Sequence, residues 1–316
     1  MGSAIPSGLA GQADLDAALD IIFAHPNVAP FISRQLIQRL VTSNPSRGYV
    51  YRVAQKFENN GSGTRGNLKA VIKAILLDPE ARDLQLVQQV GYGKQKEPIV
   101  RYIQLLRAFD GKSALPLSAL SAYGYPEGQL DNFPTGTTLY RYPNTDDALG
   151  QTPQNAPTVF NWFLPGFNPG GELAAAGLVA PELQLSTETG VIRTANYANT
   201  IIQNNDGQNV NRLVGSTDAL EENVKLDRST YEQLYDARIT AGDSVAQAAT
   251  VVLDQLDLLL TAGNFKASYA AAATPNPRSI VINTVASLDP ATTTTAARVK
   301  ELLYLLATSP EYVNQK

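Results

Sequence analysis

The chain has 316 residues, 44% of them hydrophobic, so it is long and apolar enough to bury a full core. Its formal net charge of −4 argues against a nucleic-acid partner, because phosphate binding needs a basic surface. It contains no cysteine, which excludes disulfides, thiolate nucleophiles, cysteine-bound zinc and iron–sulfur clusters.

Three helices are predicted in the amino-terminal third. Apolar residues recur at helical spacing within residues 31–41, 49–57 and 68–76. Between the first two helices, Ser43-Asn44-Pro45-Ser46 holds the capping and proline residues that end one helix and begin the next. After the third, Asp78-Pro79-Glu80 has an N-cap acid, a proline at the first helical position and a second acid in the first turn.

A glycine motif between the second and third helices has the spacing of a dinucleotide-binding turn. The motif is Gly61-Ser-Gly63-Thr-Arg-Gly66. Such a turn needs a preceding strand to bring backbone amides to the pyrophosphate, whereas the residues before Gly61 are predicted to be helical. We therefore interpret the motif as a connection between helices, in which Ser62 or Thr64 caps the next helix.

Residues 111–171 differ from the rest of the chain in composition and in hydrophobic pattern. They are rich in Gly, Pro, Asn, Thr and aromatic residues and lack a strong period, which predicts an irregular layer. The aromatic content argues against simple disorder. Strand-favouring residues at 137–142 allow a short β-hairpin within this layer.

The carboxy-terminal part returns to helical patterns. Helices are predicted at residues 181–204, 229–240, 244–260, 277–288 and 294–308. Ser309-Pro310-Glu311 then repeats the pattern of Asp78-Pro79-Glu80, which favours two helices capped alike over an internal duplication.

The fold class that follows is all-α, a multi-helix array with orthogonal or bundle-like packing. We expect a single, mostly helical domain over residues 1–316. It has helical parts at 13–110 and 172–316 and the irregular layer at 111–171 between them.

Candidates for catalysis are few. His25 is the single histidine and precedes Pro26, so it reads more simply as part of a helix connection than as a general base. Glu97 and Arg101 are four residues apart, which is typical of a surface ion pair. Glu188, which we expect on the same helix as Glu182, is of interest if it is buried.

No metal or other cofactor is expected. Zinc sites draw on Cys and His, and only His25 is present. A calcium loop begun at Asp206 would need a glutamate at its twelfth position and has Thr217 there.

Aromatic residues in and beside the irregular layer form the best candidate binding surface. Planar rings beside amide and guanidinium groups suit stacking on sugar rings or other flat ligands. The alternative is that the rings pack onto the helices as a small second core. The candidate residues are Tyr123, Tyr125, Tyr140, Arg141, Tyr142, Asn161 and Trp162.

Four blocks carry a resemblance to a known family: residues 14–82, 96–109, 144–197 and 301–312. Together they resemble the bacterial family called domain of unknown function 1800. The chain is similar to the carboxy-terminal half of that family, and the upstream half is expected to be missing.

The resemblance implies an exported protein, secreted or periplasmic, although the amino end shows no signal-peptide pattern. It also implies a co-encoded exported partner of the domain of unknown function 1501 family.

The sequence leaves two functions open. One is a non-catalytic binding or scaffold module acting at the cell surface or on an extracellular polymer such as a polysaccharide. The other is a hydrolase whose acidic site forms only in the fold or needs the upstream half.

Overall fold

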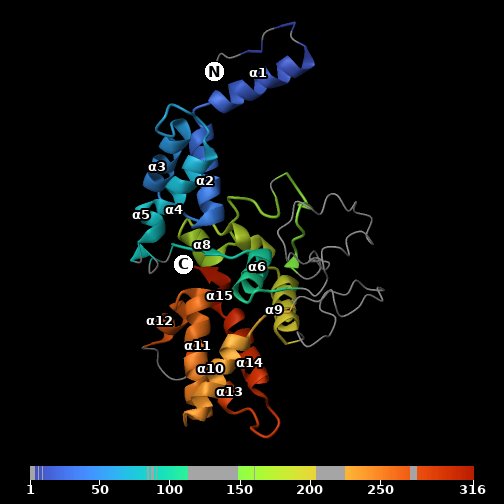
Figure 1. The fold of residues 1–316 in the computed structure, drawn as a ribbon. Helices are drawn as coiled ribbons and strands as arrows, with labels where there is room; N and C mark the ends of the chain where they lie inside the picture. Colours follow the sequence, from blue (N-terminus) through green and yellow to red (C-terminus); the bar gives the residue numbers. More distant parts are fainter. Residues whose placement is uncertain are drawn as a thin grey trace, which may run out of the picture. The chain divides into compact units, whose positions relative to one another are not determined.

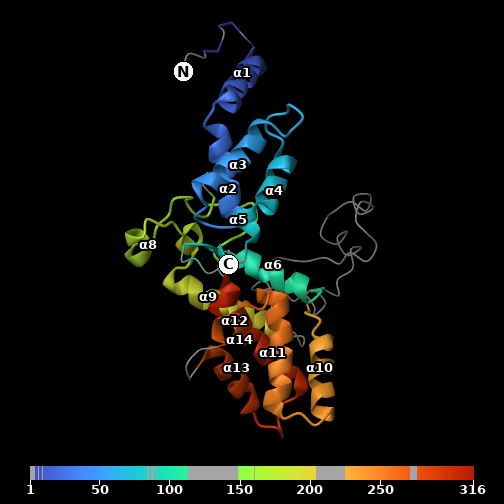
Figure 2. The same cartoon turned by 90° about the vertical axis from the view of Figure 1, so that its left-hand side faces the viewer.

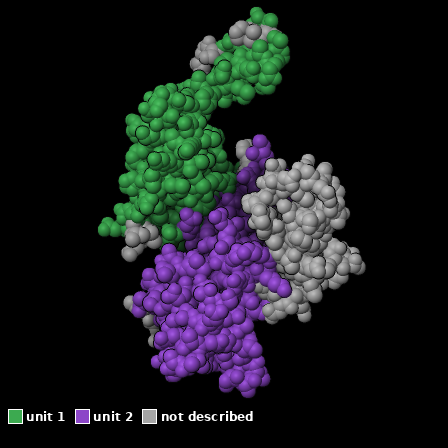
Figure 3. Space-filling view, viewed as in Figure 1, with its two compact units in different colours: residues 1–94, 164–181, 316 green, residues 95–163, 182–315 purple. Residues whose placement is uncertain are grey.

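The computed structural model describes residues 4–5, 7–8, 10–83, 85–86, 89, 91–112, 149–159, 161–203, 225–270 and 276–316. The chain forms two compact units, coloured in Figure 3. Unit 1 comprises residues 1–94, 164–181 and 316, and unit 2 comprises residues 95–163 and 182–315. Whether they fold as one domain, as the sequence predicts, stays a prediction.

The all-α prediction is confirmed, because most of the described residues are in helices and the strands among them are two of two residues each. These strands, β1 (Lys94–Gln95) and β2 (Asn314–Gln315), pair in a two-stranded sheet. Most of the predicted irregular layer, including the hairpin at 137–142, lies outside the described residues. Within the described ranges, no helix is both long and apolar enough to cross a membrane.

Unit 1 is built on three helices that pack against one another. These are α2 (Val28–Leu40), α3 (Arg47–Glu58) and α4 (Leu68–Leu77), where helices were predicted. Their buried apolar residues and Val41, which follows α2, form one core: Ala29, Ile37, Val41, Tyr49, Val53, Ala54, Phe57, Val71 and Ile75. The Tyr49 hydroxyl donates to the Ile75 carbonyl oxygen at 2.7 Å, which satisfies the polar atom inside this core.

Three shorter or more peripheral helices complete unit 1: α1 (Gly11–Ala24), α5 (Pro79–Arg82) and α8 (Gly171–Ala175). In Figure 1, α1 extends away from α3 and α4, and none of its residues is buried. Residues 164–181 are held by hydrogen bonds to α2 and to the turn after it. Gln38 Nε2 donates to the Pro165 carbonyl, and the Asn44 side chain exchanges two hydrogen bonds of 2.9 Å with the Val179 backbone.

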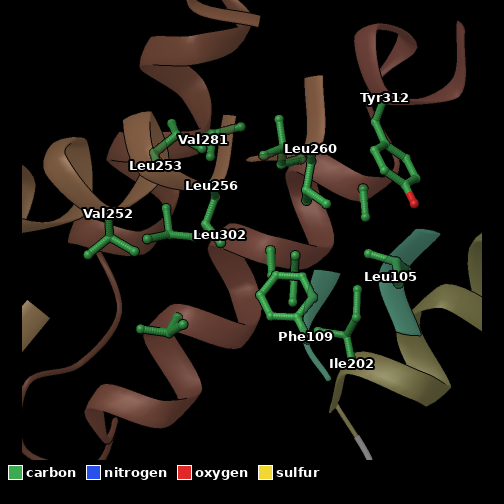
Figure 4. Packing of buried hydrophobic residues seen from close by; sticks show 14 of the residues in the cluster. Leu105, Phe109, Ile202, Val252, Leu253, Leu256, Leu260, Val281, Leu302 and Tyr312 are labelled. Carbon is green, nitrogen blue, oxygen red and sulfur yellow. The ribbon is translucent and has the colours of Figure 1, made fainter. Parts of the chain in front are cut away.

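Unit 2 is a helical bundle around α11 (Val245–Thr261). This helix packs against α10 (Ser229–Thr240), α13 (Pro277–Ala286) and α14 (Thr295–Ala307), and Figures 1 and 2 show the four together. Their apolar faces form the larger core, shown in Figure 4. The other helices of unit 2 are α6 (Pro98–Ala108), α9 (Glu188–Gln203), α12 (Asn264–Tyr269) and α15 (Pro310–Val313).

One predicted helix is wrong in detail. Residues 181–204 do not form a single helix, because a short 3-10 helix at Pro181–Leu185 ends before α9 begins at Glu188. The Thr187 hydroxyl oxygen accepts from the Gly190 backbone N–H at 3.1 Å and so caps the start of α9. Glu182 and Glu188 therefore do not share a helix.

Candidate ligand-binding site

A pocket of about 140 Å³ lies within unit 2. Its walls come mainly from α6 and α9, and the end of α14 and α15 close one side. Apolar and small side chains dominate the lining. The lining residues on which the site depends are Arg101, Tyr102, Leu105, Leu149, Gly190, Thr194, Ala198, Ile201, Thr308 and Tyr312.

Local sequence explains how the two main walls are placed. Helix α6 begins with Pro98 at its first position, where a missing N–H costs nothing. The buried Gln151 side chain accepts from the Ile99 backbone N–H at 3.2 Å, which fixes that end. In α9, Gly190 lies so close to the preceding turn that a Cβ there would be 2.8 Å from the Leu185 carbonyl oxygen.

Arg101 is the one charged side chain among the described residues that line the pocket. Its Nε is buried without a hydrogen-bond partner in the described structure. No described carboxylate lies within ion-pair distance of its guanidinium. Burial lowers the pKa of Arg101 to about 10, which still leaves it protonated at neutral pH.

Tyr312 joins Arg101 to a second buried cation. Its hydroxyl donates to the Arg101 carbonyl oxygen at 2.5 Å, and Figure 4 shows that hydroxyl directed toward α6. Lys96 Nζ lies 3.9 Å from the centre of the Tyr312 ring and donates to Gln104 Oε1 at 2.8 Å. Burial, with a smaller contribution from the Arg101 charge, lowers the pKa of Lys96 to about 8. Burial raises the pKa of Tyr312.

The surface ion pair expected between Glu97 and Arg101 is not formed. Glu97 is the residue before α6, with φ −56° and ψ 144°, so its side chain does not share a helix face with Arg101. Its Oε2 accepts from Gln151 Nε2 at 2.7 Å instead. Among the described residues, no carboxylate then pairs with the Arg101 guanidinium, and Arg101 lines the pocket.

The other catalytic candidates are not brought together by the part of the chain that the structure describes. Glu188 is exposed in the first turn of α9. Glu182 is the buried carboxylate of that segment, at 1% exposure. His25 belongs to unit 1, where it follows α1 and its Nδ1 accepts from the Asn27 backbone N–H at 3.1 Å. That contact fits the predicted role in a helix connection.

Tyr123, Tyr125, Tyr140, Arg141 and Tyr142 lie outside the described residues.

Asn161 and Trp162 are described, and both are partly buried. Asn161 has φ 74° and forms a turn in which the Thr158 hydroxyl donates to its carbonyl oxygen at 3.0 Å. Phe163, 3% exposed, is the ring of that segment that reaches the interior.

The glycine motif of unit 1 is a helix connection, as predicted, but its capping residue is different. The side chains of Asn59 and Asn60 accept hydrogen bonds from the backbone of residues 61–64. Those amides are therefore already paired. The next helix is capped by Asn67, whose side chain accepts from the Ala70 N–H, and neither Ser62 nor Thr64 takes this role.

A second cavity, of about 430 Å³, lies within unit 1, and two of its charged lining residues, Arg52 and Glu80, belong to one network of ion pairs and hydrogen bonds. Arg52 donates two hydrogen bonds of 2.7 Å to Asp78, and Ser46 donates its hydroxyl to Glu80. Asp78 Oδ1 also accepts from the Glu80 backbone N–H. Burial opposes ionisation of Asp78, but the Arg52 and backbone hydrogen bonds lower its pKa overall. This network holds α5 in place. Asp83, the remaining charged residue of the lining, accepts from the Gln85 backbone N–H at 2.9 Å.

Sequence reasoning missed Lys96 and Tyr312. The Ser309-Pro310-Glu311 turn was noticed, and it is the cap that places Tyr312, since the Ser309 hydroxyl oxygen accepts from the Tyr312 N–H at 3.3 Å. The burial of Lys96 has no local signal, because it depends on helices far away in the sequence.

Comparison with known proteins gives one match. A family model with the description Protein of unknown function (DUF1800) matches residues 1–314, which confirms the resemblance drawn from the sequence. No curated protein and no solved structure matches the chain.

Proposed function

Because the chain belongs to this family, whose description names no reaction, we propose its function from the pocket: a non-catalytic binding module that holds a small, largely apolar ligand. The observation that carries this proposal is the composition of the pocket wall. Leu105, Leu149 and Ile201 supply apolar surface, and Arg101 supplies a single charge. Concave, mostly apolar sites with few polar groups are typical of small-molecule binding.

The wall composition favours binding over hydrolysis. Acid–base hydrolysis most often uses a histidine or a carboxylate within hydrogen-bond reach of the reacting atoms. Among the described lining residues there is neither. The hydrolase alternative therefore has no supporting observation in this pocket, whereas apolar burial alone can hold a ligand.

The experiment measures binding of a neutral, ring-sized probe. Benzyl alcohol is added to the whole chain, and saturation-transfer NMR reports contact with the protein. We expect binding to the wild type and its loss in Ala198→Phe, because the larger side chain fills the pocket. Asn196→Phe is the matched control, since Asn196 is exposed on the same helix and does not line the pocket. Absence of binding, or equal binding by Ala198→Phe, would reject the proposal.

We also propose that the module works outside the cytoplasm, secreted or periplasmic, at the cell surface or on an extracellular polymer. The support is the family resemblance, which also suggests a co-encoded partner of the domain of unknown function 1501 family. Fractionation of cells that carry the natural gene tests the location: recovery in the cytoplasmic fraction alone would contradict it.

A further inference from the structure

Arg101, which is partly buried, differs from the buried cations Arg228, Arg298 and Lys300 of unit 2 in having no described partner for its charged group. Arg298 donates to the Val285 and Leu288 carbonyl oxygens, at 2.6 and 2.9 Å. Arg228 lies 3.6 Å from Glu232, and Lys300 donates to the Gln203 carbonyl oxygen at 3.1 Å. The Arg101 side chain has no hydrogen bond or ion pair to any residue that the structure describes.

A partly buried cation is costly when its Nε–H is buried without a hydrogen-bond partner and no described counterion is near. Moving a charge from water into a poorly solvated site is strongly unfavourable unless it is paired. Lys96 adds a second positive charge nearby. The two charges repel each other, so Lys96 does not neutralise Arg101. The pocket wall at Arg101 is therefore electrostatically complementary to an anion.

The rest of the wall limits what that anion can be. Leu105, Leu149 and Ile201 offer only carbon, and the hydroxyls of Thr194 and Thr308 already donate to backbone carbonyls in their own helices. A volume of about 140 Å³ is close to that of an engineered cavity of roughly 150 Å³ that holds benzene. The pocket takes one ring or a short alkyl chain, and its single lining cation does not match the higher charge of a phosphate ester.

We propose that the pocket binds a small monocarboxylate with an apolar body, its carboxylate paired with Arg101 and its ring or short chain against Leu105, Leu149 and Ile201. This inference rests on the proposed binding function and adds the chemical class of the ligand. A guanidinium provides several N–H donors in a fixed plane, which suits the two oxygens of a carboxylate.

The test compares acids with their neutral amides of equal size. Benzoate, benzamide, hexanoate and hexanamide are titrated into the whole chain at low ionic strength, and dissociation constants are measured by calorimetry or NMR. We expect each acid to bind about ten- to one-hundredfold more tightly than its amide, the range expected for a charge-assisted hydrogen bond.

Two variants assign the preference to Arg101. In Arg101→Met the acids should lose their advantage while the amides still bind, which also shows that the variant is folded. Arg193→Met removes one exposed positive charge from α9 without touching the pocket and should keep the full preference.

The outcomes separate the two proposals. Equal binding of acids and amides by the wild type would overturn the carboxylate inference and leave the binding function standing. It is the result expected if a segment of the chain already supplies the anion. An acid preference that persists in Arg101→Met would also overturn the inference. If none of the four compounds binds and benzyl alcohol does not bind either, both proposals fail.

Discussion

At the scale of single residues, the two units differ in how their partly or fully buried charged side chains are paired. In unit 1, Arg52 meets Asp78 in a two-bond ion pair, and Asp78 also caps the following helix. In unit 2, Lys96 and Arg101 both lie against Tyr312 without a described carboxylate at ion-pair distance. The first arrangement stabilises the fold, whereas the second lowers its stability at neutral pH.

Lys96 should therefore make stability depend on pH. Its pKa is about 8 in the folded chain and 10.5 in the reference state, so the unfolded chain binds the extra proton between these values. Stability should then rise with pH over that window, by about 1–2 kcal/mol between pH 7 and 9.5. Above about pH 10, ionisation of tyrosines in the unfolded chain acts in the opposite direction, since burial raises the pKa of Tyr49 and Tyr312.

The measurement is denaturant unfolding at several pH values for the wild type and Lys96→Met. The variant should be more stable at pH 7 and should lack the rise. Lys73→Met changes an exposed lysine on α4 and should keep the wild-type profile. Parallel profiles for the wild type and Lys96→Met would show that Lys96 is not the group responsible.

At the scale of elements, the pocket depends on where α9 begins. Thr187 caps the helix and Gly190 allows its first turn to lie against the Leu185 carbonyl. The 3-10 turn before it ends at Leu185, so Ser186 and Thr187 form the break that sets the direction of the helix. Four residues thus position the wall that carries Thr194, Ala198 and Ile201.

Gly190→Ala should destabilise the protein although alanine favours helices. The added Cβ would meet the Leu185 carbonyl oxygen at 2.8 Å, a backbone atom that cannot rotate away. We expect a loss of about 1–3 kcal/mol, the usual range for overpacking, and weaker binding of benzyl alcohol. Gly166→Ala is the control, because a Cβ there meets nothing within 4 Å. Equal stability of the two variants in thermal unfolding would contradict the close approach at Gly190.

The positions of most helices in unit 2 could be predicted from the sequence. The helices at 229–240, 244–260 and 294–308 follow from apolar periodicity and caps, and each agrees with the structure to within about a residue or two. The break at Ser186 and Thr187 was not predicted, although the stretch Ser186-Thr187-Glu188-Thr189-Gly190 is polar and Thr187 is a residue type that favours the N-cap position. The pocket could not be predicted at all, since Arg101 and Tyr312 are brought together by packing between distant segments.

At the scale of the whole molecule, neither unit is one continuous stretch of chain. Unit 1 combines residues 1–94 with residues 164–181, and unit 2 combines residues 95–163 with residues 182–315. The chain therefore passes from unit 1 to unit 2, returns to unit 1 and then enters unit 2 again. Each unit therefore holds the two ends of a segment that belongs to the other. If unit 2 unfolds, unit 1 must close a flexible loop formed by residues 95–163, and if unit 1 unfolds, unit 2 must close a loop formed by residues 164–181. The cost of closing such loops is about 3–4 kcal/mol.

This chain-entropy coupling predicts one cooperative transition, in keeping with the single domain expected from the sequence. Ile37→Ala in the core of unit 1 and Leu302→Ala in the core of unit 2 should each lower the free energy of unfolding by about 2–5 kcal/mol and shift the same transition. Leu258→Ala, at a position 63% exposed, should have little effect. A calorimetric trace that splits into two steps in either core variant would show that the units unfold separately.

The contact between Asn44 and Val179 has a consequence for the chemical ageing of the protein. Only an amide can both donate and accept there, so conversion of Asn44 to aspartate would remove one of the two bonds. The usual route to that conversion begins with attack by the nitrogen of the next residue, which must carry a hydrogen. Pro45 has none. The side chain that fastens residues 164–181 is thereby protected from deamidation, the commonest spontaneous damage to asparagine, by its neighbour in the sequence.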